Sequence, residues 1–155
     1  MIKVRDIVKR FGDLEVLHGV SLDIADGEIV SIVGASGAGK STLLQIMGSL
    51  LRADGGSVAI DDVELSALSD DRLSDFRNRH IGFIFQSYHL LPEFTAVENV
   101  MMPMLIAGAK RSEAEARAKE LLGMVGMSHR EEHKPEALSG GEQQRVAIAR
   151  ALINR

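Results

Sequence analysis

A glycine-rich turn at residues 34–42, which reads GASGAGKST, sets the strongest limit on how this chain folds. It fits the pattern G-x-x-x-x-G-K-[ST], which ends here with Lys40 and Ser41. The apolar run at 29–33 precedes it and predicts a buried strand of a parallel sheet. A helix is predicted after it, because apolar residues recur there at helical spacing: Leu43, Leu44, Met47, Leu50 and Leu51. A strand, this turn and a helix in that order predict an α/β fold.

The same turn predicts a phosphate-binding loop. Glycines let successive backbone N–H groups point at phosphate oxygens, and the following helix adds the partial positive charge of its N-terminus. Lys40 is expected to hold the β and γ phosphates of a nucleotide, and the Ser41 hydroxyl to bind Mg²⁺. The alternative is a plain glycine-rich turn with a solvated lysine, but such a turn rarely needs three glycines and a lysine at this spacing.

Strands are predicted mainly before residue 86 and helices after it. Strand patterns cover residues 2–8, 20–24, 57–60 and 81–85, and a helix is predicted to begin near Ser69. Further on, Thr95–Glu98 and Ser112–Glu115 each fit a capping box, which predicts that each opens a helix. The second of these helices is expected to end near Gly126 and to carry one apolar stripe: Ala114, Ala118, Leu121, Leu122 and Val125. The sequence therefore predicts a helical lobe over about residues 87–135.

The segment 138–145 reads LSGGEQQR and predicts a helix with an unusually bare start. Ser139 and Glu142 fit a third capping box. Capping does not explain Gly140 and Gly141, since a glycine in a helix costs roughly 1 kcal/mol relative to alanine. Bare backbone at a helix N-terminus favours the close approach of an anion. We interpret this segment as an anion-binding helix start, with capping alone as the alternative.

Three motifs together resemble those of the ATP-binding cassette (ABC) transporter ATPases, in that family's order. Residues 34–42 look like its Walker A motif, Gln86 at the end of IGFIFQ like its Q-loop, and residues 138–143 like its signature motif. The resemblance runs along the whole chain. It implies an ATPase that uses Mg²⁺ and works as a head-to-tail dimer, in which the signature helix of one subunit faces the ATP held by the other.

The resemblance also implies a role for each matching position. Lys40 and Gln86 are the catalytic candidates, and Ser41 and Gln86 are the candidate Mg²⁺ ligands. Ser139, Gly140 and Gly141 are expected to donate hydrogen bonds to the γ-phosphate across the dimer interface. The full set expected at the nucleotide is Phe11, Gly34, Ser36, Gly37, Ala38, Gly39, Lys40, Ser41, Thr42, Ser139, Gly140, Gly141 and Gln143.

Three of these assignments have structural alternatives. Phe11 matches the family's aromatic residue that stacks on adenine, but a phenylalanine at a strand end also fits a core position. Gln86 is expected to touch Mg²⁺ and the attacking water and to report the nucleotide state to the helical lobe, whereas a polar residue that ends a strand needs no such role. Thr42 is expected at the α-phosphate, although a threonine in a first helical turn also has a structural explanation.

The expected fold class is α/β, with a P-loop NTPase-type parallel sheet, an antiparallel β subdomain and an α-helical subdomain. Residues 1–86 are assigned to the β subdomain and P-loop core, about 87–135 to the helical subdomain, and 136–155 to the signature motif and its helix. Family ATPases continue into an apolar strand ending in aspartate, a catalytic glutamate, a D-loop and a switch histidine, none of which occurs in this sequence. We therefore expect the N-terminal part of a cassette with an incomplete core, which binds nucleotide and hydrolyses it poorly or not at all.

The segment 88–108 is similar to the lipoprotein-releasing (LolD-like) and macrolide-exporter (MacB-like) branch, whose groove receives a helix of the membrane subunit. It has more apolar residues than one helix face buries: Leu90, Leu91, Phe94, Val97, Met101, Met102, Met104 and Leu105. Core packing alone is the alternative. The LolD-like branch is the first choice, with the macrolide-exporter type next. Either implies integral membrane subunits as partners and a place on the cytoplasmic face of the inner membrane.

Composition argues against several other classes. Eighteen basic and 22 acidic residues give a net charge of −4, which predicts no general attraction to nucleic acid. Cysteine is absent, so disulfides and cysteine nucleophiles are excluded. The apolar run 100–107 is shorter than the roughly 18 residues of a membrane span. Two other readings stay open: a soluble ABC protein that acts on nucleic acid, and a non-enzymatic fragment whose exposed sheet edge favours aggregation.

Overall fold

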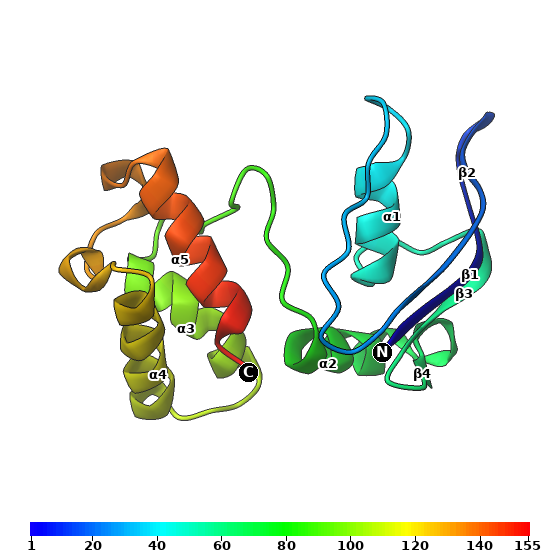
Figure 1. Ribbon diagram of the computed structural model, residues 1–155. Helices are drawn as coiled ribbons and strands as arrows, with labels where there is room; N and C mark the ends of the chain where they lie inside the picture. Colours follow the sequence, from blue (N-terminus) through cyan, green and yellow to red (C-terminus); the bar gives the residue numbers. More distant parts are fainter. The chain divides into compact units, whose positions relative to one another are not determined.

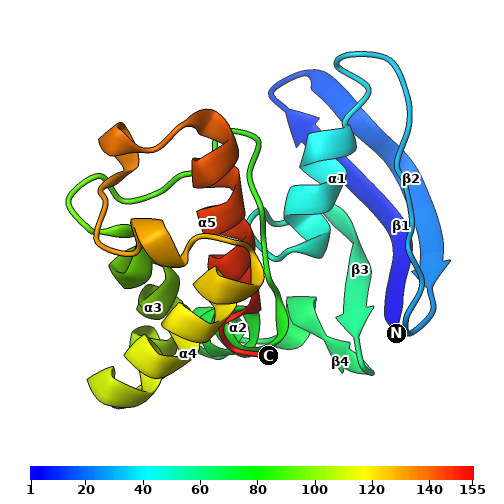
Figure 2. The ribbon, with the colours of Figure 1, turned by 60° about the vertical axis from the view of Figure 1, so that its left-hand side comes forward.

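The computed structural model describes residues 1–155, which form two compact units, residues 1–73 and residues 74–155 (Figures 1 and 2). The first unit contains the sheet and the glycine-rich turn, and the second is largely helical. No helix combines the length and the apolar character needed to cross a lipid bilayer. The three-part division expected at residues 86 and 135 stays a prediction.

A four-stranded antiparallel sheet in the order β2-β1-β3-β4 builds the first unit. The long strand β1 (Ile2–Phe11) pairs with β2 (Leu14–Ile24) on one side and with β3 (Gly55–Ile60) on the other. The short strand β4 (Val63–Glu64) completes the sheet at its edge. This confirms the predicted antiparallel β part and extends its strands beyond the predicted ranges.

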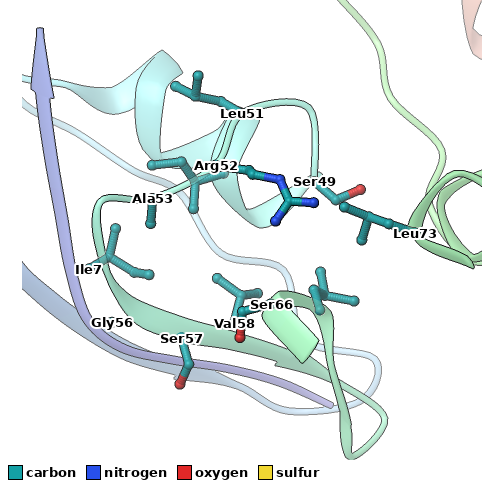
Figure 3. A pocket seen from close by; sticks show the side chains of 12 residues that line it. Ile7, Ser49, Leu51, Arg52, Ala53, Gly56, Ser57, Val58, Ser66 and Leu73 are labelled. Atoms are coloured by element: carbon teal, nitrogen blue, oxygen red, sulfur yellow. The ribbon is translucent and has the colours of Figure 1, made fainter. Parts of the chain in front are cut away.

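The core of the first unit lies between this sheet and α1 (Lys40–Met47) (Figure 2). A cavity of about 110 Å³ marks one end of this core, and Figure 3 shows Ile7 and Val58 of the sheet facing it. Ile46 of α1 also lines it. The buried apolar residues of the unit come from the sheet, from α1 and from the 3₁₀ turn Leu65–Ala67: Val4, Ile7, Leu17, Leu43, Ile46, Met47, Val58, Ile60 and Leu65.

Three helices pack around one core in the second unit: α3 (Ala96–Ile106), α4 (Arg111–Met124) and α5 (Gly140–Leu152). The helix α2 (Asp70–His80) begins in the first unit and ends in the second, and it buries none of its residues. Two 3₁₀ turns, Ser128–Arg130 and Pro135–Ala137, connect α4 to α5. The predicted stripe of α4 is confirmed, because Ala114, Ala118, Leu121 and Leu122 are buried and Val125 packs against them.

A single buried amide holds the chain that leads into α3. Asn99 is the only polar residue among the fully buried side chains, and its Oδ1 accepts a hydrogen bond from the Leu91 N–H at 2.7 Å. Its Nδ2 donates to the carbonyl oxygens of Leu91, Phe94 and Thr95, each at 3.0 Å. All its hydrogen-bonding groups are therefore paired, which offsets the cost of burying them.

The predicted parallel sheet is absent, and this is the main correction to the expected fold. Residues 29–33 and 81–85 form no strand, and neither segment pairs with the antiparallel sheet. Ile29 and Val33 are 96% and 87% exposed instead of buried. The physical reason is that a strand exists only where a neighbouring strand accepts and donates its backbone hydrogen bonds. The mixed α/β class with antiparallel and helical parts is confirmed.

Two details of the predicted helices are also wrong. The helix α4 begins after Lys110, whose carbonyl already accepts from the Glu113 and Ala114 N–H groups, so Ser112 lies inside the helix and caps nothing. The helix α1 ends at Met47, because Gly48 caps it and the chain turns away at Ser49, where φ is 56°. The predicted apolar stripe of α1 is therefore shorter than expected, and its members Leu44 and Leu50 are exposed.

The apolar segment 88–108 is largely part of the core. Val97 and Met101 are buried, and three more of its apolar side chains pack against the same core: Leu90, Met104 and Leu105. Leu91 and Ile106 remain exposed, at 39% and 69%. Core packing, the alternative interpretation of this segment, thus accounts for most of the residues that suggested a groove.

Candidate functional site

The glycine-rich turn leads directly into α1, and Gly39 is the residue on which this geometry depends. Gly39 caps the helix with φ at 83°, in the left-handed region that favours glycine. A Cβ at this position would lie 2.8 Å from Leu17 Cδ2 and 3.0 Å from Val16 Cγ1, both on β2. Only glycine therefore fits where the loop passes β2 and turns into the helix.

Residues 36–42 and Val16 line an open hollow of about 350 Å³ above the start of α1. The Lys40 ammonium turns back into the loop, where Nζ donates to the carbonyl oxygens of Gly34 at 2.9 Å and Ala35 at 2.6 Å. The first intrahelical hydrogen bond runs from the Leu43 N–H to the Gly39 carbonyl, so the N–H groups before Leu43 have no carbonyl partner in the helix. The hollow thus combines a cation with free N–H donors, which suits phosphate oxygens.

Three further predicted residues of this unit are accessible to a ligand. Ser41 is exposed in the first turn of α1, and Thr42 is half-buried beside it. Phe11 ends β1 with 51% of its surface exposed, and the Lys9 ammonium lies 5.6 Å from its ring centroid. Its exposure rules out the core position that was the alternative for Phe11. An exposed ring at a strand end is free to stack on a flat ligand.

In the second unit, the predicted capping box at the start of α5 is confirmed. Ser139 Oγ accepts a hydrogen bond from the Glu142 N–H at 3.3 Å, and Glu142 Oε2 accepts from the Ser139 N–H at 2.8 Å. The hydroxyl accepts through its oxygen from the Glu142 N–H, and its hydrogen faces the Glu142 carboxylate. The N–H and hydroxyl of Ser139, and then the Arg130 guanidinium, hold the pKa of the Glu142 carboxyl below its ordinary value.

The two glycines that follow are not required by the fold. Their φ values are not in the left-handed region, and a Cβ would find only ordinary contacts at 3.8 Å, with the Tyr88 hydroxyl for Gly140 and with Arg145 Nη1 for Gly141. Both residues are exposed, and their N–H groups have no acceptor within the chain. Capping alone therefore leaves both glycines unexplained, and their N–H groups are available to an acceptor from outside the chain.

Gln143 has a structural task as well as its predicted one. Its Nε2 donates to the carbonyl oxygens of Pro135 at 3.0 Å and Leu138 at 3.1 Å, which fixes the turn before α5. Both amide hydrogens are used in these bonds, so only Oε1 remains for other partners. A direct contact of Gln143 with nucleotide stays a prediction.

Gln86 is exposed and lies in a turn. The C-terminal part of α5 holds this turn in place. Arg150 donates to the carbonyl oxygens of Tyr88 at 2.6 Å and His89 at 2.7 Å, two residues with φ of 58° and 46°. Burial lowers the pKa of Arg150, whose charge these carbonyl oxygens solvate. The sequence analysis missed Arg150 and Tyr88, because nothing in a helix-end arginine or a loop tyrosine indicates a contact with residues 60 positions away.

The structure thus gathers the predicted residues into two groups. Phe11 and residues 34–42 belong to the first unit, and Gln86 with residues 139–143 belongs to the second. The first group has the chemistry of a phosphate site, and the second presents an uncovered helix N-terminus. No cluster of histidine, aspartate or glutamate side chains suited to a metal ion is present, so a Mg²⁺ ion would depend on hydroxyl, amide and phosphate oxygens.

Comparison with known proteins connects these groups to a family. Residues 17–155 match the family described as "ABC transporter". Three similar relatives each bear the name "Lipoprotein-releasing system ATP-binding protein LolD". That of Bacteroides thetaiotaomicron is 60% identical over 154 residues, covering 99% of this chain and 71% of the relative. That of Cytophaga hutchinsonii is also 60% identical, over 99% and 70%. That of Geobacter metallireducens is 58% identical, again over 99% and 70%.

The fold also matches solved structures. The ATP-binding cassette MJ0796, solved as a dimer in a post-hydrolysis state bound to ADP and Pi, superposes with a TM-score of 0.92 at 43% sequence identity. The match covers 99% of this chain and 70% of that one. A second dimeric structure of MJ0796, described as a bacterial ABC transporter cassette, gives the same TM-score at 44% identity.

Proposed function

Since this chain belongs to the ABC transporter family, as an ATP-binding subunit of the LolD type, we propose that the full-length protein couples ATP hydrolysis to lipoprotein release from the inner membrane. We propose that residues 1–155 alone bind the nucleotide and hydrolyse it poorly or not at all. The working unit of the full-length protein is a head-to-tail dimer with two shared ATP sites. The dimeric state of the matching cassette supports this arrangement. Macrolide export is the neighbouring alternative, and the LolD names of the three relatives favour lipoprotein release.

The first half of each ATP site is the hollow before α1. Lys40 exchanges its two loop carbonyl oxygens for the β and γ phosphate oxygens, which carry full negative charge and bind an ammonium more strongly. The loop N–H groups of Gly34, Ser36, Gly37, Ala38 and Gly39 surround the phosphates, and Thr42 meets the α-phosphate. Phe11 stacks on the adenine. The observation that carries this assignment is the Lys40 ammonium, which is turned into the loop toward the carbonyl oxygens of Gly34 and Ala35.

The second half of the site is the start of α5 from the partner copy. Ser139, Gly140 and Gly141 donate to the γ-phosphate, with Gln143 Oε1 beside them. The support is that the glycines answer no need of the fold, since their N–H groups are unpaired and a Cβ would fit at both positions. An anion supplied by a second subunit gives these donors a partner.

The Ser41 hydroxyl and the Gln86 side chain are the groups proposed to hold Mg²⁺. Both side chains are exposed and carry an oxygen of the kind that Mg²⁺ prefers. The bound ion neutralises phosphate charge. Gln86 in addition orients the attacking water and links the nucleotide state to the helical unit, through the turn that Arg150 holds.

Nucleotide binding is tested by replacing the lysine. We expect Lys40→Ala to weaken ATP binding by roughly 100-fold, because it removes a charge-assisted contact with the phosphates. Binding is measured by titration with fluorescent ATP. Lys110→Ala is the matched control, since Lys110 lies exposed before α4 and should leave affinity unchanged. Unchanged affinity in the Lys40 variant would refute the proposed site.

The membrane role makes a separate prediction about partners. We propose that the protein lies on the cytoplasmic face of the inner membrane, bound to integral membrane transporter subunits, with no nucleic-acid partner. Affinity purification from detergent-treated membranes should recover those subunits, and ATP with Mg²⁺ should then drive lipoprotein release from reconstituted vesicles. Recovery of nucleic acid in place of membrane subunits would favour the soluble ABC class.

A further inference from the structure

The anion site proposed at the start of α5 contains an anion of its own. Glu142 lies in the first turn, two residues after Gly140, and its carboxylate is fixed there by the Ser139 N–H at 2.8 Å. A negative side chain that completes a capping box stabilises the helix, but it repels a phosphate that approaches the same turn. A site for the γ-phosphate therefore needs a cation that cancels this charge.

Arg130 is placed to do so. Its Nε donates to Glu142 Oε1 at 3.1 Å, so the carboxylate is held on one oxygen by Ser139 and on the other by Arg130. The Glu142 side chain is only 14% exposed, which reduces screening of its charge by water. Arg145 also lies beside this turn, yet it forms no ion pair with Glu142. Arg130 is the residue that pairs with the carboxylate.

Arg130 is itself held in position. Its Nη1 contacts His133 Nε2 at 3.1 Å, and because a guanidinium only donates, the histidine nitrogen accepts. The His133 carbonyl oxygen in turn accepts from the Ala96 N–H at 2.8 Å, which ties this turn to the start of α3. The guanidinium is thus oriented by a rigid part of the helical core.

We propose that Arg130 is a positioning residue of the signature site, which neutralises Glu142 so that the first turn of α5 accepts the γ-phosphate of the ATP held by a second copy. This rests on the proposed function, because it assumes that Ser139, Gly140 and Gly141 meet a phosphate. It assigns Arg130 no contact with ATP.

The test is a charge-rescue cycle in the full-length protein, with KM for ATP and kcat measured at low salt. Arg130→Gln should raise KM about tenfold, because it uncovers the Glu142 charge. Glu142→Gln gives the reference KM against which the double variant is compared, since glutamine also completes a capping box. The double variant Arg130→Gln/Glu142→Gln should recover at least half of the lost affinity, because no charge is left to neutralise.

Arg111→Gln is the matched control, since Arg111 pairs with Glu98 in the capping box of α3 at 3.4 Å and should leave KM unchanged. An Arg130 that only braces the loop through His133 would not be rescued by Glu142→Gln, so a double variant as poor as Arg130→Gln overturns the proposal. A wild-type KM in Arg130→Gln overturns it equally. Failure of the proposed function itself would be recognised separately, because ATP affinity would then be unchanged in Lys40→Ala.

Discussion

The helices α3 and α5 begin with the same capping box and differ in what covers it. In α3, Thr95 Oγ1 accepts from the Glu98 N–H at 3.3 Å and Glu98 Oε2 accepts from the Thr95 N–H at 3.1 Å. The box formed by Ser139 and Glu142 in α5 has nearly the same distances. The Thr95 N–H above all lowers the pKa of Glu98, as the Ser139 N–H does for Glu142. The capping box alone does not separate the two helix starts.

The difference lies in the next two N–H groups. In α3, the N–H of Ala96 donates to the His133 carbonyl oxygen at 2.8 Å, and that of Val97 to the Glu131 carbonyl oxygen at 2.9 Å. Both side chains are buried in the core. In α5, Gly140 and Gly141 occupy the same positions, are exposed and have no acceptor in the chain. One helix start is closed by the protein, and the other is open, as the proposed contact with a phosphate requires.

The open start costs the fold some stability. Each glycine in a helix is roughly 1 kcal/mol less favourable than alanine, and nothing in the first turn of α5 recovers this loss. In α3 the same two positions add apolar burial to the core. The two glycines lower the stability of the helix and leave its N-terminus accessible to the proposed ligand. This is a trade-off between stability and activity.

The largest effect is expected when the first turn of α5 is given the residues of α3. In the full-length protein, we expect Gly140→Ala/Gly141→Val to lower ATP hydrolysis by about 100-fold or more, because the side chains keep the phosphate from two N–H donors. The same change should raise the free energy of unfolding by about 1 kcal/mol, since better helix formers replace glycine. Hydrolysis is measured by phosphate release, and stability by urea unfolding.

The reverse change in α3 is the control for that experiment. Ala96→Gly should lower the free energy of unfolding by about 1 kcal/mol and leave hydrolysis unchanged, because its N–H is already used by the His133 carbonyl oxygen. If the substituted α5 start keeps full hydrolysis, the two helix starts are equivalent and the bare turn has no ligand. If it loses both stability and hydrolysis, the glycines serve the fold.

The comparison also shows how far the sequence could be taken. The pattern S/T-x-x-E is interpreted as a capping box at Thr95, Ser112 and Ser139, and it caps a helix at the first and last but not at Ser112. A local motif indicates which capping hydrogen bonds a segment is able to form. The helix α4 begins after Lys110, two residues before Ser112, because the Lys110 carbonyl oxygen accepts the first helical hydrogen bonds. The motif at Ser112 does not predict this earlier start.

Long-range pairing was the part that could not be predicted. The apolar run 29–33 has the composition of a buried strand, yet Ile29 is 96% exposed because no strand pairs with it. Arg130 and Arg150 resemble any solvated arginine in the sequence, and their roles come from partners 12 and more than 60 residues away. The glycine-rich turn before α1 and the capped start of α5 were predictable because each is formed within one short segment. Their contacts with nucleotide remain predictions.

The smallest effect that still separates the two helix starts comes from their capping hydroxyls. Thr95→Ala and Ser139→Ala should each lower the free energy of unfolding by about 1 kcal/mol, because each removes the side-chain acceptor of a helix N–H. In the full-length protein only Ser139→Ala should also slow ATP hydrolysis, by roughly tenfold, since that hydroxyl is proposed to turn its hydrogen from the Glu142 carboxylate to the γ-phosphate. Ser139→Thr keeps the hydroxyl and should retain most of the activity. Equal hydrolysis by the two alanine variants would mean that Ser139, like Thr95, only caps its helix, and it would leave the anion site to the glycine N–H groups alone.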